Sequence, residues 1–236
     1  MGMVNEKTIF VVLVILLITI NYNFLNNKVE DFFTDYQTGV VERVIDGDTL
    51  VLETSEHVRL LGINTPEKGE PYYEEAKEFL ESRVLNKSIT LKYGKEKYDK
   101  YQRLLAYVFL ENENINVEIV ESGLGNYYFY DGRDKYSGAL EDAWTKCLEE
   151  EINLCEPSQN YCKNCIEIAE DYVINSCSFS CDISDWEIKG EGREKFVFSE
   201  VLNENQKAYF ELDLSDSGRT LFLRDSEGKL VLWETH

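Results

Sequence analysis

Oxygen ligands and arginines that could act on a phosphodiester are concentrated between Asp46 and Arg103 of this chain. Asp46-Gly47-Asp48 is followed by Arg59, by Asn64-Thr65-Pro66-Glu67 and finally by Arg103. Hard cations such as Ca²⁺ take oxygen ligands, a carboxylate can orient an attacking water, and fixed cationic donors stabilise a phosphorane. Each motif alone has a structural alternative, such as a turn or a helix start. Their joint occurrence in this order predicts metal-assisted phosphodiester chemistry.

The stretch from about Gly39 to about Leu154 resembles the staphylococcal nuclease (thermonuclease) family, through Asp46-Gly47-Asp48-Thr49-Leu50, the segment 59–67 and Asp99-Lys100-Tyr101-Gln102-Arg103. The resemblance implies a Ca²⁺ cofactor held by the side chains of Asp48 and Asn64 and the carbonyl of Thr65. It implies that Glu67 orients the water and that Arg59 and Arg103 bind the phosphate. Tyr101 and Lys100 would border the nucleotide.

Asn64 departs from the family, which most often has aspartate at this position. An amide oxygen can still bind Ca²⁺, but the ligand set loses one negative charge. The leading hypothesis is therefore a Ca²⁺-dependent endonuclease of low sequence specificity, acting on DNA or RNA. The alternative is a catalytically inactive module on the cell surface that binds nucleic acid or protein.

Short alternating segments indicate a mainly β fold with a few helices. Strands are predicted at 40–44, 49–52, 58–63, 88–93 and 104–110, and helices at 72–85, at 116–122 ending at Gly123, and from an N-cap at Ser137. This order suits an OB-fold β-barrel over residues 38–156. In the aromatic run 127–130, core packing is expected for at least two of the four side chains.

The N-terminal segment 1–28 is predicted to be a signal anchor, because 9–20 is almost wholly apolar. No small-x-small cleavage site follows it, although a cleaved signal peptide is the alternative. The expected location is therefore anchored at the membrane and facing outside the cytoplasm, or secreted if the segment is removed. The protein is expected to be a monomer.

Six cysteines follow residue 146, and an even number beyond an export segment predicts disulfides. Cys177 and Cys181 bracket a turn and could pair locally, while the other pairings cannot be read from the sequence. The alternative is a zinc site, since Cys162 and Cys165 have ligand-like spacing. Residues 156–160 are predicted to be a linker.

Residues 163–236 show short strands separated by turns, which predicts an immunoglobulin-like β-sandwich. This segment resembles the lamin-tail domain family through Cys181-Asp182-Ile183-Ser184-Asp185-Trp186-Glu187-Ile188 and the hairpin 220–231. Trp186 is expected in the core, and the domain is expected to bind a ligand that the sequence does not name.

The chain has a net charge of −21. Residues 36–161 have 14 basic and 25 acidic side chains, and residues 162–236 have 8 and 16. A tight nucleic-acid binder is normally basic. Binding a polyanion would therefore depend on a divalent cation and on a local basic cluster formed by Lys87, Lys92, Lys95, Lys97, Lys100 and Arg103.

Overall fold

The computed structural model describes residues 10, 15–17, 19, 36–130, 132–169, 171–212 and 220–235. The chain divides into two compact units, Met1–Tyr36 and Gln37–His236. Most of the predicted anchor at 1–28 lies outside the described residues. Within the described part of the chain, no helix is both long and apolar enough to cross a membrane.

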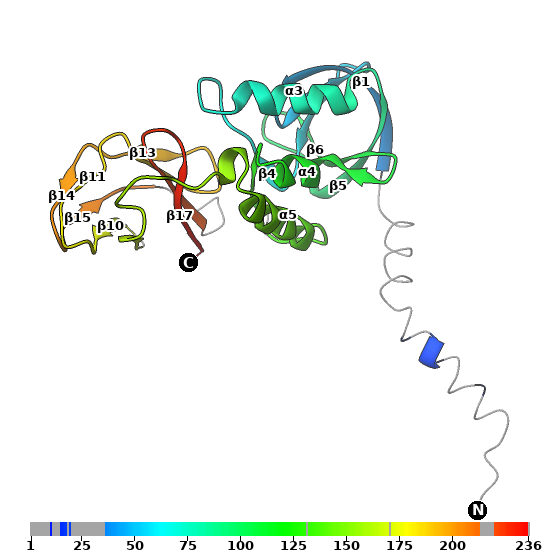
Figure 1. The fold of residues 1–236 in the computed structure, drawn as a ribbon. Coiled ribbons are helices and arrows are strands. Elements are labelled where there is room, and N and C mark those ends of the chain that lie inside the picture. The colour runs from blue at the N-terminus through cyan, green and yellow to red at the C-terminus, as the bar shows by residue number, and fades with distance from the viewer. Residues whose placement is uncertain are drawn as a thin grey trace, which may run out of the picture. The chain divides into compact units, whose positions relative to one another are not determined.

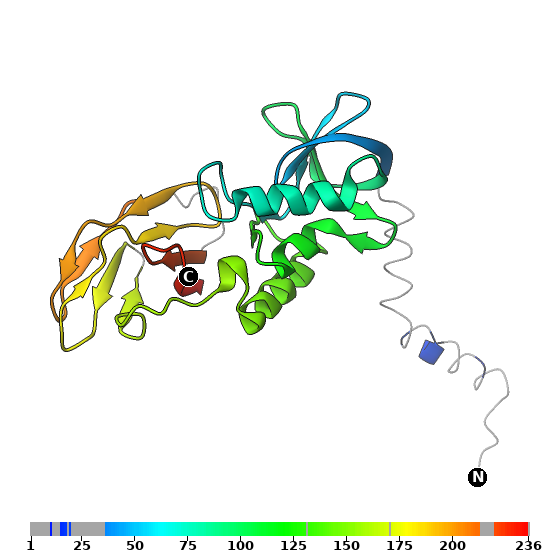
Figure 2. The ribbon, with the colours of Figure 1, turned by 45° about the horizontal axis from the view of Figure 1, so that its top comes forward.

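A closed β-barrel forms the first half of the second unit (Figures 1 and 2). Its strand order is β3-β2-β1-β5-β6, and parallel pairing of β3 with β6 closes it. β7 adds a sixth strand beside β6. The bounds are Tyr36–Asp46 for β1, Thr49–Leu52 for β2, His57–Leu60 for β3, Ser88–Tyr98 for β5, Leu104–Leu110 for β6 and Glu113–Asn114 for β7. The predicted strands and the OB-like barrel are confirmed.

Three helices cover the barrel, namely α3 (Tyr73–Val84), α4 (Ile115–Glu121) and α5 (Ser137–Glu150). Their apolar positions point inward: Leu80, Ile119 and Leu140 are fully buried in one core with the strands. The predicted Ser137 N-cap is wrong by one residue, because Tyr136 is the N-cap and Ser137 begins the helix. The Ser137 Oγ accepts a hydrogen bond from the backbone N–H of Asp134 at 2.8 Å and not from an N–H of the helix.

The chain beyond the barrel forms antiparallel sheets around a second core. One sheet has the order β15-β10-β9, from Lys207–Tyr209, Tyr172–Asn175 and Ile166–Ile168. Another has the order β13-β12-β16-β17, from Lys195–Val197, Glu187–Lys189, Thr220–Arg224 and Leu230–Thr235. A short pair joins β11 (Cys181–Asp182) to β14 (Val201–Leu202). Trp186 is 1 % exposed in this core, as predicted.

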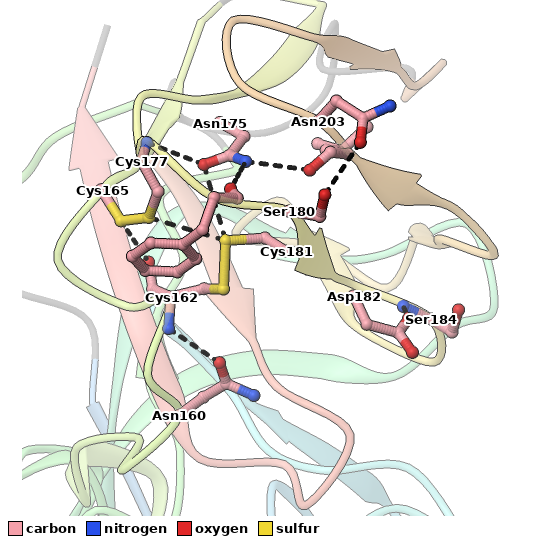
Figure 3. The surroundings of a disulfide bond; sticks show 12 residues. Asn160, Cys162, Cys165, Asn175, Cys177, Ser180, Cys181, Asp182, Ser184 and Asn203 are labelled. Atoms are coloured by element: carbon pink, nitrogen blue, oxygen red, sulfur yellow. Dashed lines mark hydrogen bonds between the residues drawn. A yellow bond between two sulfur atoms is a disulfide. The ribbon is translucent and has the colours of Figure 1, made fainter.

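All six cysteines are paired in disulfides, Cys147–Cys155, Cys162–Cys181 and Cys165–Cys177. The predicted local pair of Cys177 with Cys181 is therefore wrong. Asn175 shapes this turn: its Oδ1 accepts from the N–H of Cys177, and its Nδ2 donates to the carbonyls of Phe179 and Leu202 (Figure 3). The resulting loop directs the two cysteines toward different partners. The sulfurs of Cys162, Cys177 and Cys181 lie within 4.8 Å of one another because two disulfides are adjacent, so the zinc alternative has no free thiolates here.

The two cores are not independent. Phe222 on β16 is 3 % exposed and packs edge-on against Trp144 of α5, with ring centroids 5.2 Å apart. The predicted linker joins this packing: Ser158 is fully buried and its N–H donates to the carbonyl of Leu230. Residues 156–158 run beside β17, and this satisfies their backbone groups in place of water. The linker is therefore part of the packed unit, and the predicted boundary between 156 and 163 stays a prediction.

Candidate active site

The Asp48 carboxylate lies at the tight turn between β1 and β2 and is only 2 % exposed. Gly47 makes this turn possible. A Cβ at residue 47 would lie 2.7 Å from the Ala76 Cβ and 2.8 Å from the Thr65 Oγ1. The absence of that Cβ lets the turn approach both α3 and the segment after β4.

Asp48 is the centre of a buried polar cluster. Its Oδ2 lies 3.1 Å from the Arg59 Nη2 and accepts from the N–H and hydroxyl of Thr65 at 3.1 and 3.2 Å. Register explains the pairing, because Thr49 lies directly opposite Arg59 across β2 and β3. The sequence separates these residues by up to 17 positions, and the barrel brings them within hydrogen-bond distance.

Asn64 ends the short strand β4 (Ile63–Asn64), which pairs with β8 (Asn126–Tyr127). Its side chain is 1 % exposed. The Asn64 Oδ1 accepts from the Arg59 Nη2 at 3.3 Å, and the Nδ2 donates to the carbonyl of Gly192 at 3.1 Å. The amide oxygen therefore faces the side of the cluster that holds Asp48 and Arg59.

The cluster has more negative than positive charge. Asp46 lies next to Asp48, and burial followed by the negative charge of Asp48 raises the pKa of Asp46. Arg59 is the guanidinium that faces Asp48. Carboxylate, amide and backbone carbonyl oxygens form the kind of donor set that a hard cation binds. The side-chain oxygens of Asp48 and Asn64 therefore fit a hard cation.

Glu67 follows the cluster and remains accessible, with 40 % of its side chain exposed. Its Oε1 lies 2.6 Å from the Nε of Arg193. Its backbone N–H donates to the Oε2 of Glu70, which also lies 3.0 Å from the ammonium of Lys189. Burial alone would raise the pKa of Glu70, but the charge of Lys189 and hydrogen bonds from Glu67, Lys189 and Lys195 lower it to about 2.

Among residues 36–130, no hydrogen bond or ion pair links the Arg103 side chain to Asp48; its partner is Asp99. Its Nε lies 2.7 Å from Asp99 Oδ2, and Asp99 Oδ1 accepts the N–H groups of Tyr101 and Arg103. The Arg103 guanidinium lies 5.6 Å from the Tyr101 ring, and the Lys100 ammonium lies 5.3 Å from the same ring. Tyr101 is 68 % exposed. These three residues form a cationic and aromatic loop between β5 and β6, and this loop adjoins β3 because Leu104 pairs with Val58.

Of the aromatic run, Tyr127 is buried and Phe129 packs against the barrel core, so the expectation of at least two core side chains is confirmed. Two contacts of the site have no signal in the sequence: Asn64 contacts Gly192, and Glu67 contacts Arg193. Gly192 and Arg193 lie more than 120 residues further along the chain, and no local pattern marks them.

Comparison with known proteins supports a nuclease site in this barrel. Residues 57–156 match the family model described as staphylococcal nuclease homologue. A thermonuclease of Staphylococcus intermedius is 37 % identical over 126 residues, which are 50 % of this chain and 75 % of that protein. A thermonuclease of Staphylococcus hyicus is 36 % identical over 116 residues, covering 45 % and 69 %. An uncharacterised endonuclease of Haemophilus influenzae is 35 % identical over 147 residues, covering 59 % and 82 %.

The barrel, the buried carboxylate–guanidinium cluster and these relatives together define a hydrolase of the endonuclease class. The chain belongs to the staphylococcal nuclease family. The family match ends at residue 156, so the lamin-tail resemblance of residues 163–236 stays a prediction.

Proposed function

We propose that this protein is a Ca²⁺-dependent endonuclease that hydrolyses DNA or RNA with low sequence specificity. The single observation that carries the proposal is the buried contact of Asp48 with Arg59 and Thr65, joined by the amide oxygen of Asn64. A barrel core can be filled with apolar side chains, whereas this one holds a buried carboxylate that needs Arg59 and Thr65 as partners to offset its desolvation. A functional site is the physical reason to retain it.

Asp48, Asn64 and the carbonyl of Thr65 would hold the Ca²⁺ ion. When bound, the ion supplies positive charge beside the phosphate and favours attack by water. The loss of one carboxylate at position 64 should weaken the ion's affinity relative to an aspartate at the same place.

Glu67 is assigned the role of orienting the attacking water, because it follows Thr65 by two residues and its carboxylate is open to solvent. Arg59 is held rigidly by the Asp48 carboxylate and by the carbonyl of Leu60, to which its Nη1 donates at 2.6 Å. A preorganised guanidinium can stabilise charge as it develops on the phosphate oxygens. Arg103, held by Asp99, would contribute from the neighbouring loop.

The loop with Lys100, Tyr101 and Arg103 is proposed to bind the substrate backbone and one base. Exposed tyrosine rings stack on bases of any sequence, and phosphate contacts hold position without reading sequence. Lys92 and Lys97 of the same hairpin lie over the rings of Phe109 and Tyr93. Lys87 is exposed and donates to the carbonyls of Ser82 and Arg83.

The direct test uses residues 37–236, the second compact unit. Circular single-stranded DNA, closed circular duplex and circular RNA have no ends, so their cleavage reports an endonuclease. We expect cleavage with millimolar Ca²⁺, none with EDTA, and a loss of about a hundredfold or more in Glu67→Gln. Arg43, exposed on β1, gives the control Arg43→Ala, which should retain full activity. Failure of every substrate with Ca²⁺ would leave the binding module as the function.

We propose further that the protein works outside the cytoplasm, attached by residues 1–28. The support is the pairing of all six cysteines, since disulfides persist in oxidising compartments. Mass spectrometry of protein from the native host under non-reducing conditions should find no free thiol. Six free thiols would contradict this location.

A further inference from the structure

The hairpin formed by β12 and β13, residues 187–197, contacts the part of the nuclease site between Asn64, at the end of β4, and Glu70. Three residues of that segment are held: Asn64 by the Gly192 carbonyl, Glu67 by Arg193, and Glu70 by Lys189 and Lys195. The hairpin contacts the segment at three successive places, so the contact is a continuous interface. The family match, which ends at residue 156, does not include this hairpin.

The Gly192 carbonyl and the Arg59 guanidinium both favour one orientation of the Asn64 amide. With the Nδ2 donating to Gly192, the Oδ1 is left to face Arg59 and the proposed ion. A hydrogen bond to the far side of a metal ligand fixes the orientation of the ligand toward the metal. An aspartate at position 64 would have no hydrogen to donate to this carbonyl. The departure of Asn64 from the family pattern thus matches the presence of the hairpin.

Arg193 contacts Glu67 without closing it off. The Arg193 and Glu67 side chains are 53 % and 40 % exposed, so water still reaches the carboxylate. The guanidinium binds the Oε1 through its Nε at 2.6 Å and restricts the rotamers of the carboxylate. This arrangement fits a residue that positions Glu67 and does not fit one that blocks it.

The tip of the hairpin is itself fixed. Glu191 is 2 % exposed, its carboxylate accepts from the N–H of Phe129, and its carbonyl accepts from the Nδ2 of Asn126. Asn126 belongs to β8, the partner strand of β4. Gly192 and Arg193 therefore meet Asn64 and Glu67 from a rigid support, as precise positioning requires.

We propose that the β12–β13 hairpin completes the nuclease site, with the Gly192 carbonyl orienting the Asn64 amide as a ligand and Arg193 acting as a positioning residue for Glu67. The inference rests on the proposed function for its kinetic part. Its structural part, the orientation of Asn64, is independent of activity.

The kinetic test compares Arg193→Gln and Arg193→Lys with the wild-type protein, at saturating Ca²⁺. Arg193→Gln should lower kcat about tenfold with little change in KM, and Arg193→Lys should restore most of the rate. Lys146→Gln is the matched control, because Lys146 forms an equally exposed ion pair with Glu121 on the helical side of the barrel. It should behave as wild type. An unchanged or increased kcat in Arg193→Gln would overturn the positioning role, and an increase would identify the hairpin as an inhibitor.

The structural test follows the side-chain amide protons of Asn64 by NMR of the ¹⁵N-labelled protein. We expect them to exchange much more slowly than those of Asn86, which is exposed, and to show a cross-peak with Gly192 or Arg193. Exchange as fast as in Asn86 would overturn the proposed orientation. If the wild-type protein cleaves nothing, the proposed function fails while this measurement still decides whether the hairpin holds Asn64.

Discussion

Replacing Glu70 by glutamine should remove a stabilising charge that joins the two halves of the second unit. Glu70 accepts from the N–H of Glu67 and lies 3.0 Å from the ammonium groups of Lys189 and Lys195. Its side chain is only 15 % exposed, so solvent screens these interactions weakly. We expect Glu70→Gln to lower the free energy of unfolding at pH 7.

The magnitude follows from the pKa of Glu70, which is lowered from 4.5 to about 2. Each pKa unit corresponds to about 1.4 kcal/mol, so the ionised carboxylate contributes about 3 kcal/mol. Because the folded pKa lies below the unfolded one, this contribution is present in full above pH 4.5. It is lost as the pH falls from 4.5 through about 2.

The assay is urea unfolding followed by tryptophan fluorescence at several pH values between 7 and 2.5. The difference between wild type and Glu70→Gln should be largest above pH 5 and should shrink steadily below it. Glu75→Gln is the control, since Glu75 is exposed on α3 close by. A difference that does not change with pH, or one equal to that of Glu75→Gln, would refute the electrostatic argument.

Three further outcomes are expected. Phe222→Ala should lower the free energy of unfolding by about 3–4 kcal/mol and keep a single unfolding transition, because the Phe222 ring packs in the barrel core against Trp144. Two separated calorimetric transitions would show that the two halves unfold independently. Replacing Cys165 and Cys177 together by serine should cost about 2–3 kcal/mol in denaturant unfolding, since the bridge closes a short loop of 12 residues; unchanged stability would contradict that role. Tyr101→Ala should raise KM for single-stranded DNA about fivefold to a hundredfold with kcat nearly unchanged, by loss of base stacking of about 1–3 kcal/mol. A fall in kcat alone would contradict a role for Tyr101 in substrate binding.

The barrel could be predicted from the sequence because short stretches of neighbouring residues determine its strands and helices. The alternating segments define β1, β2, β3 and β6, and the apolar stripe of 72–85 defines α3. Asp48, Arg59 and Thr65 could also be predicted together, because the motifs lie on adjacent strands and turns and their order resembles a known family. The N-cap of α5, Tyr136, was predicted one residue too late at Ser137, whose hydroxyl accepts from the N–H of Asp134.

The remaining features depend on contacts between distant parts of the chain. The disulfide partners of Cys177 and Cys181 are determined by how the loop around Asn175 folds, and cysteine spacing does not record this. The Gly192 carbonyl that accepts from Asn64 is a backbone group 128 residues away, so no side-chain motif in the sequence predicts this contact. The sequence predicted that Phe222 lies on a strand of a separate C-terminal domain. In the structure its side chain is part of the barrel core.

The most direct measurement is the rate of single-stranded DNA hydrolysis as a function of Ca²⁺ concentration, for wild type and Asn64→Asp. We expect a saturable rate in both proteins, with half-saturation at lower Ca²⁺ in Asn64→Asp because the ligand set regains a charge. That variant should lose about 1 kcal/mol of stability with the hydrogen bond to Gly192. If the wild-type protein hydrolyses nothing even at millimolar Ca²⁺ while Asn64→Asp does, the natural protein is a binding module and the proposed endonuclease activity is wrong.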